Sequence, residues 1–199
     1  MDSWVLKAME RWPNVPVLFG WLGLDRRGRW LIKREPITHP RIVATINRNY
    51  GVDEHGRWFF QNGPQRGYVE FDYAPYVLRV EDEGFTTHNG LRVTHPERMF
   101  LDETGTLGVA TEYGFGEIAG TDLEWLLERM KIRGAPLSED ALATLLEGPS
   151  NAPTETVLEL GKTIIPIVRL DANDLPQRFG FVRKPQPLAG ERVSTHAPD

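Results

Sequence analysis

The sequence predicts an α+β fold, mainly antiparallel β, built around an internally duplicated unit of hairpin, Thr-His-Pro and helix, with flanking helices. The first observation is a repeated pattern of an apolar residue, an acid, two polar residues, Gly and a return to apolar residues. It occurs at Leu24–Pro36 and again 28 residues later at Val52–Pro64, with weaker copies at Val80–Phe85 and Leu101–Leu107. Each copy is typical of a hairpin turn, because the acid can accept backbone hydrogen bonds and Gly permits a positive φ.

The second observation is that Thr-His-Pro occurs at residues 38–40 and again at 94–96, which are 56 residues apart, twice the step of 28. In the first copy Pro40 precedes an apolar stripe that ends before Gly51, as expected of a helix with Pro in its first turn and Gly beyond its end. In the second copy the segment before the next turn is shorter by seven residues. We therefore expect a single helical turn there.

Helices are expected where apolar residues recur at helical spacing between start and stop signals. Trp4, Ala8 and Trp12 share one face of the first, and Thr121 with Glu124 forms a capping box for the third. The predicted helices are 3–12, 40–50, 121–133 and 138–147.

Strands are expected where short apolar or alternating runs lie between turn signals. Gly161-Lys162 predicts a two-residue hairpin, and Pro166 favours an edge position for its second strand. The predicted strands include 15–24, 67–71, 76–80, 156–160, 163–170 and a last short one at 178–182.

The domain organisation expected from these elements has three parts. Residues 1–150 form the duplicated α+β body, and SNAPT at 150–154 is the expected boundary. Residues 151–184 form a C-terminal β-hairpin extension that packs on the body or on a partner chain, since a two-stranded hairpin is not stable alone. Residues 185–199, rich in proline and polar residues, are expected to be a disordered tail.

Composition favours a globular cytoplasmic protein. The chain has 199 residues, of which 40% are apolar and 26% charged, and it contains no cysteine. That balance excludes a chain disordered throughout. The absence of cysteine excludes disulfides and thiolate chemistry and suits a reducing compartment. No apolar run is long enough to cross a membrane, and the N-terminus lacks the pattern of a secretory signal, so no membrane partner is expected.

The net charge of −5 is unevenly distributed along the chain. Residues 1–50 hold nine basic and four acidic groups, whereas residues 101–150 hold three basic and ten acidic groups. Such an asymmetry can orient an acidic partner or pair two copies head to tail in a homodimer. The simpler interpretation is that both segments contribute ordinary solvated surfaces.

The residues favoured for binding lie on one predicted face of the repeated hairpins. Side chains alternate across a strand, so the residues that follow each turn place an Arg, an apolar and a polar side chain on one side. Arg and aromatic residues are enriched at binding hot spots, and the basic character suits an acidic or phosphate-bearing ligand. An alternative is that the acidic helices between 121 and 147 cover this face. The candidate binding residues are Arg29, Leu31, Lys33, Arg57, Phe59, Gln61, Asn62, Gln65 and Arg66.

No residue set forms a recognised catalytic or cofactor signature, and no cofactor is expected. His39 and His95 could meet and hold a metal if the two halves are related by symmetry. Their position before proline fits a cap at the start of a helical turn better. The acids Asp25, Asp53 and Asp102 are interpreted as turn formers. The glycine-rich run at 113–120 lacks the residues of a phosphate loop.

The sequence leaves the biochemical function open. The favoured hypothesis is a non-enzymatic binding or regulatory module that recognises a protein or a small anionic ligand. One alternative is a metal-dependent or hydrolytic enzyme, which would need His, Asp, Glu or Arg side chains to converge in a concave site. Another is a protein that binds single-stranded nucleic acid, which the mixture of Arg, Asn, Gln and aromatic residues allows but the negative net charge disfavours.

The segments GWLGLDRRGRW, the Thr-His-Pro helix start and DEHGRWFFQNGPQRGYVEFDYAPYVLRV resemble an uncharacterised family of conserved proteobacterial hypothetical proteins. More distantly, they resemble other bacterial domains of unknown function with duplicated hairpins. The resemblance covers roughly residues 15–130 and implies a bacterial cytoplasmic protein. It implies no activity, catalytic residue or cofactor. For the distant relatives a signalling or regulatory role is suggested by fold alone.

Overall fold

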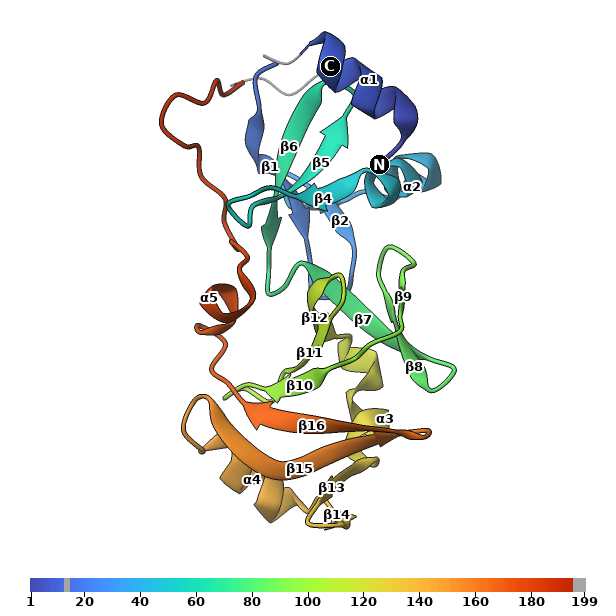
Figure 1. The fold of residues 1–199 in the computed structure, drawn as a ribbon, viewed down its shortest axis with the longest axis vertical. Coiled ribbons are helices and arrows are strands. Elements are labelled where there is room, and N and C mark those ends of the chain that lie inside the picture. The colour runs from blue at the N-terminus through green and yellow to red at the C-terminus, as the bar shows by residue number, and fades with distance from the viewer. Residues whose placement is uncertain (13–14, 195–199) are drawn as a thin grey trace. The chain divides into compact units, whose positions relative to one another are not determined.

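The computed structural model describes residues 1–12 and 15–194, which fold as two compact units. Unit 1 comprises Met1–Pro75 and Gly180–Asp199, and unit 2 comprises Tyr76–Phe179. Both units contain sheets with helices beside them (Figure 1). The α+β class is therefore confirmed.

Unit 1 is built on a six-stranded sheet with the order β3-β2-β1-β6-β5-β4. The central pair β1–β6 is parallel, and every other neighbouring pair is antiparallel. Helix α2 follows the edge strand β3 in the sequence. The Trp30 indole N–H in β2 donates a hydrogen bond to Asn47 Oδ1 in α2 at 2.7 Å, which connects the sheet to this helix. The elements are α1 (Ser3–Arg11), β1 (Leu18–Leu24), β2 (Trp30–Ile32), β3 (Glu35–Pro36), α2 (Pro40–Arg48), β4 (Tyr50–Val52), β5 (Trp58–Asn62) and β6 (Gln65–Phe71).

Unit 2 contains a ten-stranded sheet with the order β14-β13-β15-β16-β10-β11-β12-β7-β8-β9. Its elements are β7 (Tyr76–Glu81), β8 (Gly84–Thr87), β9 (Arg92–Val93), β10 (Arg98–Leu101), β11 (Leu107–Thr111), β12 (Gly114–Ile118), the 3-10 helix η1 (Gly120–Asp122), α3 (Leu123–Leu127), β13 (Met130–Ile132), β14 (Ala135–Pro136), α4 (Glu139–Leu146), β15 (Ala152–Leu160), β16 (Thr163–Arg169) and α5 (Leu175–Phe179).

Six neighbouring strands of unit 2 have the same order and directions as the sheet of unit 1. The order β9-β8-β7-β12-β11-β10 corresponds to β3-β2-β1-β6-β5-β4. The central pair is parallel in both, with Leu22 opposite Val69 in unit 1 and Leu78 opposite Ile118 in unit 2. The remaining four strands of unit 2 extend its sheet beyond β10, where β16 pairs in parallel.

Three of the predicted turns share one hydrogen-bond pattern. Asp25, Asp53 and Asp102 each donate their backbone N–H to the carbonyl four residues later, at 3.0–3.1 Å. In each, Oδ1 accepts from the backbone N–H groups two and four residues ahead, and the Gly that closes the turn has φ between 73° and 84°. The turn-forming role of these acids is confirmed. The weak copy at 80–85 differs, since Asp82 and Glu83 adopt the positive φ angles.

The two Thr-His-Pro segments take different structures. In the first, Pro40 begins α2 and His39 is an extended N-cap, as expected. The second forms no helical turn, so that prediction is wrong. There the carboxylate of Glu112 accepts from the backbone N–H groups of Thr94 and His95, at 2.7 and 3.4 Å. This side chain satisfies the N–H groups, and the shortened segment passes directly into β10.

Two predicted elements are wrong because partners distant in sequence override local pattern. The helix expected over 121–133 ends at Leu127, and the fully buried Met130 enters β13 opposite Leu158. The strand expected over 178–182 does not form: residues 178 and 179 end α5, residues 180–182 have no regular secondary structure, and the Phe179 ring stacks on Phe115 with centroids 4.5 Å apart. The helices expected at 3–12, 40–50 and 138–147 are present at Ser3–Arg11, Pro40–Arg48 and Glu139–Leu146.

The division expected at residues 150–154 lies inside unit 2. The hairpin β15–β16 follows this point and belongs to the sheet of the same unit. The chain then returns to unit 1, where Val17 donates to Arg192 O and accepts from the Ser194 N–H, both at 2.8 Å. Figure 1 shows this final segment in red. Residues 185–194 are therefore tied to unit 1 rather than disordered, and residues 195–199 lie outside the described residues.

Candidate functional site

An apolar pocket of about 640 Å³ lies in unit 1 between α2 and one face of the sheet. Strands β1, β2, β5 and β6 supply Leu18, Leu22, Ile32, Phe60 and Gly67, and α2 supplies Ile42, Thr45 and Ile46. This volume is within the range of pockets that hold small ligands. The remaining lining residues are Trp21, Lys33, Ile37, Arg41, Asn62 and Gln65.

The pocket is hollow where a strand lacks a side chain. Gly67 lies in β6, and a Cβ built there would find no atom nearer than Phe60 O at 4.0 Å. Gly116 has the corresponding place in unit 2. Gly67 lies two residues before Val69, which pairs with Leu22, and Gly116 lies two residues before Ile118, which pairs with Leu78. A Cβ at Gly116 would lie 2.7 Å from Leu78 Cγ. The equivalent space in unit 2 is thus filled.

Two cationic side chains line this otherwise apolar pocket. The Lys33 ammonium lies 4.0 Å from the centroid of the Trp21 ring, in a cation–π contact. Arg41 is an exposed residue in the first turn of α2. Within residues 1–12 and 15–194, neither Lys33 nor Arg41 makes an ion pair. The pocket therefore combines an apolar interior with positive charge that an anion could neutralise.

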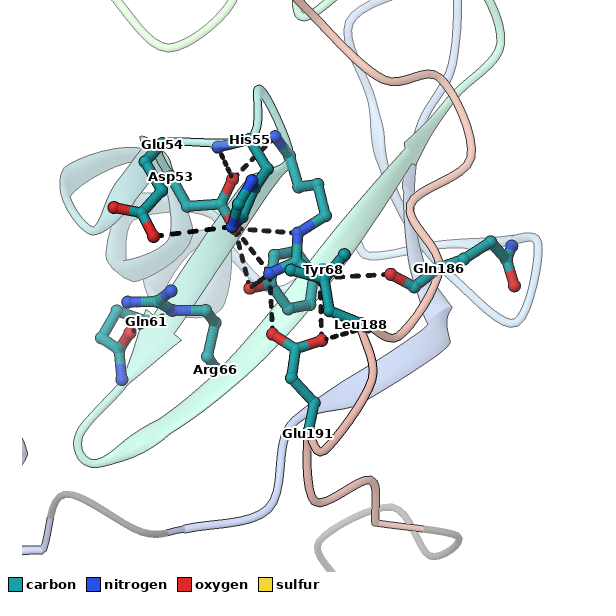
Figure 2. A network of polar contacts seen from close by, with 10 residues as sticks. Asp53, Glu54, His55, Gln61, Arg66, Tyr68, Gln186, Leu188 and Glu191 are labelled. Carbon is teal, nitrogen blue, oxygen red and sulfur yellow. Dashed lines mark hydrogen bonds and ion pairs between the residues drawn. The ribbon is translucent and has the colours of Figure 1, made fainter.

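A second notable arrangement in unit 1 is the Arg57 network, formed by Asp53, Arg57, Tyr68 and Glu191 (Figure 2). Arg57 is 5% exposed, and its Nε donates to Asp53 Oδ2 at 2.9 Å. Its Nη2 donates to the Tyr68 hydroxyl at 2.8 Å, which in turn donates to Asp53 Oδ2 at 3.0 Å. Glu191 accepts from both ends of the guanidinium fork, at 2.8 Å from Nη1 and 2.7 Å from Nη2.

These contacts shift the protonation equilibria of the Arg57 network. Hydrogen bonds from Arg57 lower the pKa of Glu191 despite partial burial. Burial disfavours the charged form of Asp53, but hydrogen bonds from Arg57 and Tyr68 outweigh it and lower the pKa of Asp53. The Glu191 carboxylate is the main cause that raises the pKa of Arg57, and burial raises the pKa of Tyr68. All three charged groups are thus ionised at neutral pH.

A polar cavity, also of about 640 Å³, adjoins the Arg57 network. The turn that carries Asp53 forms one part of its lining and the segment that carries Glu191 forms another. His55 and Arg66 contribute two further cationic or titratable side chains. We call it the Arg57 cavity, and its lining residues are Asp53, Glu54, His55, Arg57, Arg66, Tyr68, Leu188, Ala189, Gly190 and Glu191.

The nine residues favoured from the sequence do not form one exposed face. Strands β2 and β5 are separated in the sheet by β1 and β6. Leu31, Arg57, Phe59 and Gln61 are buried, with exposures between 1% and 5%. The exposure expected for that face is therefore wrong for these four residues, although Arg29 and Lys33 are exposed. The Arg66 guanidinium lies 3.8 Å from the Phe59 ring centroid.

The remaining candidates are divided between three places. Lys33, Asn62 and Gln65 line the apolar pocket. Arg66 lines the Arg57 cavity, and Arg29 pairs with Asp25 in its own turn, with Nη2 2.7 Å from Oδ2. Sequence reasoning missed Gly67 and Glu191. Gly67 carried a signal, since an isolated Gly within a strand pattern marks a place that something can approach closely.

The histidines form no metal site in the described part of the chain. His39 belongs to unit 1 and His95 to unit 2, and both are exposed. No group of three His, Asp or Glu side chains in residues 1–12 and 15–194 could hold a metal ion. His88 is buried in unit 2, where burial lowers its pKa to about 3 and its Nδ1 accepts from the Val77 N–H at 3.3 Å.

Within the described ranges, no helix has the length and apolar character that a membrane crossing requires.

The fold and the pocket define an α+β protein with a ligand-sized cavity in one of two β-rich units. The chain belongs to the family described as "Protein of unknown function (DUF2946)", whose model matches residues 1–186. No curated protein matches the chain.

Two solved structures are similar to this chain. A DUF1285 family protein from Silicibacter pomeroyi DSS-3 has 18% identity and a TM-score of 0.50, over 84% of this chain and 96% of that one. A DUF1285 family protein from Shewanella baltica OS155 has 13% identity and a TM-score of 0.40, over 55% of this chain and 88% of that one. The first likeness supports the fold alone.

Proposed function

We propose that the protein is a non-enzymatic binding module and that its apolar pocket takes a small anion with an apolar body. The observation that carries this proposal is the combination of an apolar interior of about 640 Å³ with two cations that have no ion-pair partner among the described residues, Lys33 and Arg41. Burial of the ligand's apolar body supplies affinity, and the cations select a negative headgroup.

The lining of the pocket favours binding over catalysis. Its described polar members are Lys33, Arg41, Thr45, Asn62 and Gln65, without a His, Asp or Glu that could act as a general acid or base. We place this module in the cytoplasm, as the absence of cysteine suggests. A regulatory role would follow if the ligand changes what the protein binds, since a ligand acts only through different affinities for two states.

The proposal predicts that filling the hollow abolishes binding without loss of stability. In Gly67→Val the new side chain enters the pocket, and its Cβ meets no atom nearer than 4.0 Å. The probe is the fluorescent amphipathic anion 8-anilinonaphthalene-1-sulfonate, displaced by decanoate. We expect saturable fluorescence in the natural protein and its loss in Gly67→Val, with an unchanged melting temperature.

Charge selection is tested in the same assay. Lys33→Gln combined with Arg41→Gln should weaken decanoate binding roughly tenfold and leave decanol binding unchanged. Arg34→Gln is the matched control, because Arg34 is adjacent in sequence but pairs with Asp72 at 2.7 Å and does not line the pocket. Equal decanoate binding by the natural protein and Gly67→Val would refute the proposal.

We also infer that the two six-stranded segments are copies of one ancestral hairpin, Thr-His-Pro and helix unit. The shared strand order and direction support this inference. So do the offsets between paired residues: Leu22 and Leu78 correspond at a step of 56, and Val69 and Ile118 at a step of 49, which is smaller by the seven residues that the second copy lacks. In a crystal structure, superposing the two segments at these offsets should align β1 with β7 and the Asp53 turn with the Asp102 turn. A better fit at any other offset would contradict the duplication.

A further inference from the structure

Arg57 is held in place by side chains of the β4–β5 turn and of strand β6. Asp53 accepts from Nε at 2.9 Å and the Tyr68 hydroxyl accepts from Nη2 at 2.8 Å. The Tyr68 ring is fixed in turn, since it stacks on Phe19 with centroids 4.5 Å apart and an interplanar angle of 13°. A guanidinium held in this way has little side-chain freedom left to lose when it binds an anion.

The corresponding turn shows that the Asp–Arg pair needs no further carboxylate. Arg29 donates from Nε to Asp25 Oδ2 at 2.8 Å, the same contact that Arg57 makes with Asp53. Its side chain is 49% exposed, and Asp25 is its ion-pair partner within the described residues. The turn therefore orients an arginine by itself, and Glu191 is an additional occupant of the fork at Arg57.

Glu191 binds this fork as a free carboxylate would. Its two oxygens lie 2.8 and 2.7 Å from Nη1 and Nη2, a bidentate arrangement. It comes from a segment anchored on either side by backbone bonds, from Phe71 N–H to Arg183 O at 2.9 Å and from Val17 N–H to Arg192 O at 2.8 Å. Residues 186–190 between these anchors are exposed and have no regular secondary structure. Two contacts tie this loop to the fork: Gln186 O accepts from Arg57 Nη1 at 3.1 Å, and the Leu188 N–H donates to Glu191 Oε2 at 2.7 Å. A ligand that displaces Glu191 has to replace these contacts, while the two backbone anchors can remain.

The Arg57 cavity provides room for a ligand larger than the carboxylate itself. Its lining includes Arg57 and Glu191 together with His55 and Arg66, whose donors could contact the body of a ligand. Figure 2 shows the Glu191 carboxylate reaching the network near Tyr68, with Arg66 to one side, where its Nε donates to Gln61 Oε1 at 3.1 Å. We propose that Arg57 is the centre of a second binding site, specific for small-molecule carboxylates, which Glu191 occupies in cis and a ligand enters by displacing it. This site is independent of the apolar pocket.

The test is chemical rescue of Glu191→Ala by acetate in the 199-residue chain. The melting temperature is measured at pH 7 against acetate concentration, with chloride keeping the ionic strength constant. We expect a saturable rise of about 2–4 °C in Glu191→Ala when acetate is several-fold above its dissociation constant. The natural protein should not respond over the same range, because a tethered carboxylate competes at a high effective concentration.

The site of rescue is identified by the Arg57 Nε–Hε resonance, which should shift with the same saturation curve. Asp72→Ala is the matched control in unit 1, since it frees Arg34, a cation whose side chain is 65% exposed. An equal response in this control would mean a general anion effect and would overturn the proposal. So would a folded Glu191→Ala in which neither the melting temperature nor the Arg57 resonance responds to acetate.

Glu191→Gln provides the test if Glu191→Ala does not fold. The Gln amide keeps an acceptor for Arg57 but carries no charge. Acetate has to displace this amide, so half-saturation should need a higher acetate concentration than in Glu191→Ala. If neither variant folds in chloride, acetate should restore folding in both. Failure of acetate to restore folding, or to bind the folded Gln variant, would leave Glu191 as a structural clamp and refute the carboxylate site.

Discussion

Alanine at Gly56 is expected to destabilise unit 1 by about 3 kcal/mol or more. Gly56 closes the Asp53 turn with φ of +73°, and its Cβ would lie 2.2 Å from Gly180 O. The positive φ costs of order 1–3 kcal/mol for a residue with a side chain, and overpacking adds about 1–3 kcal/mol. The clash is with backbone, so it can be relieved only by moving the segment whose Val182 N–H donates to Gly56 O at 3.0 Å.

Gly105→Ala is the matched control for this prediction. Gly105 closes the equivalent Asp102 turn with φ of +84°, and no atom lies within 4 Å of its added Cβ. The Gly105→Ala variant should therefore lose only the part of the unfolding free energy that comes from the positive φ, about 1–2 kcal/mol. Urea unfolding of both variants measures the difference. Equal losses would show that the C-terminal segment does not press on Gly56 in solution.

The hairpin turns could be predicted from the sequence because their signals are local, whereas the parallel pairing of β1 with β6, which joins Leu22 to Val69, carries no local signal. In each Asp-x-x-Gly turn the acid accepts hydrogen bonds from the backbone of the same turn, so the turns at Asp25, Asp53 and Asp102 can be recognised from the acid and the glycine alone.

The hairpin β13–β14 has no such sequence pattern. It nevertheless matches β2–β3 in register, and each hairpin is followed by a helix. The Leu137 N–H donates to Met130 O at 3.0 Å, as the Ile37 N–H donates to Trp30 O at 2.8 Å.

The candidate sites were harder to predict because they depend on partners distant in sequence. Alternation placed Arg57, Phe59 and Gln61 on a common side, but nothing local distinguishes an exposed side from a buried one. Arg57 is buried against the carboxylate of Glu191, which lies 134 residues later in the sequence. No sequence pattern indicates that the C-terminal segment returns to this strand. The apolar pocket was partly visible, because Lys33, Asn62 and Gln65 were among the candidates and line it.

Arg57→Met should destabilise the protein at pH 7 by about 3–5 kcal/mol. The substitution keeps an apolar side chain of similar length but leaves Asp53 and Glu191 without their shared cation. Removal of one partner from a buried ion pair costs this amount because it leaves uncompensated charge. Arg29→Met is the matched control: Arg29 makes the same contact with its turn acid but is 49% exposed, so its loss should cost at most about 1 kcal/mol.

The loss in Arg57→Met should shrink as the pH falls. In the natural protein the pKa values of Asp53 and Glu191 are lowered, so the stability they contribute is present above their unfolded values, near 4, and declines as the pH falls through the lowered folded values. Without Arg57 these carboxyl groups protonate more readily, and at low pH neither protein carries the charge. Urea unfolding between pH 3 and 7 should therefore show the two stabilities converging toward acid. A difference that stays constant over this range would mean that Arg57 stabilises unit 1 through packing rather than through its two carboxylates.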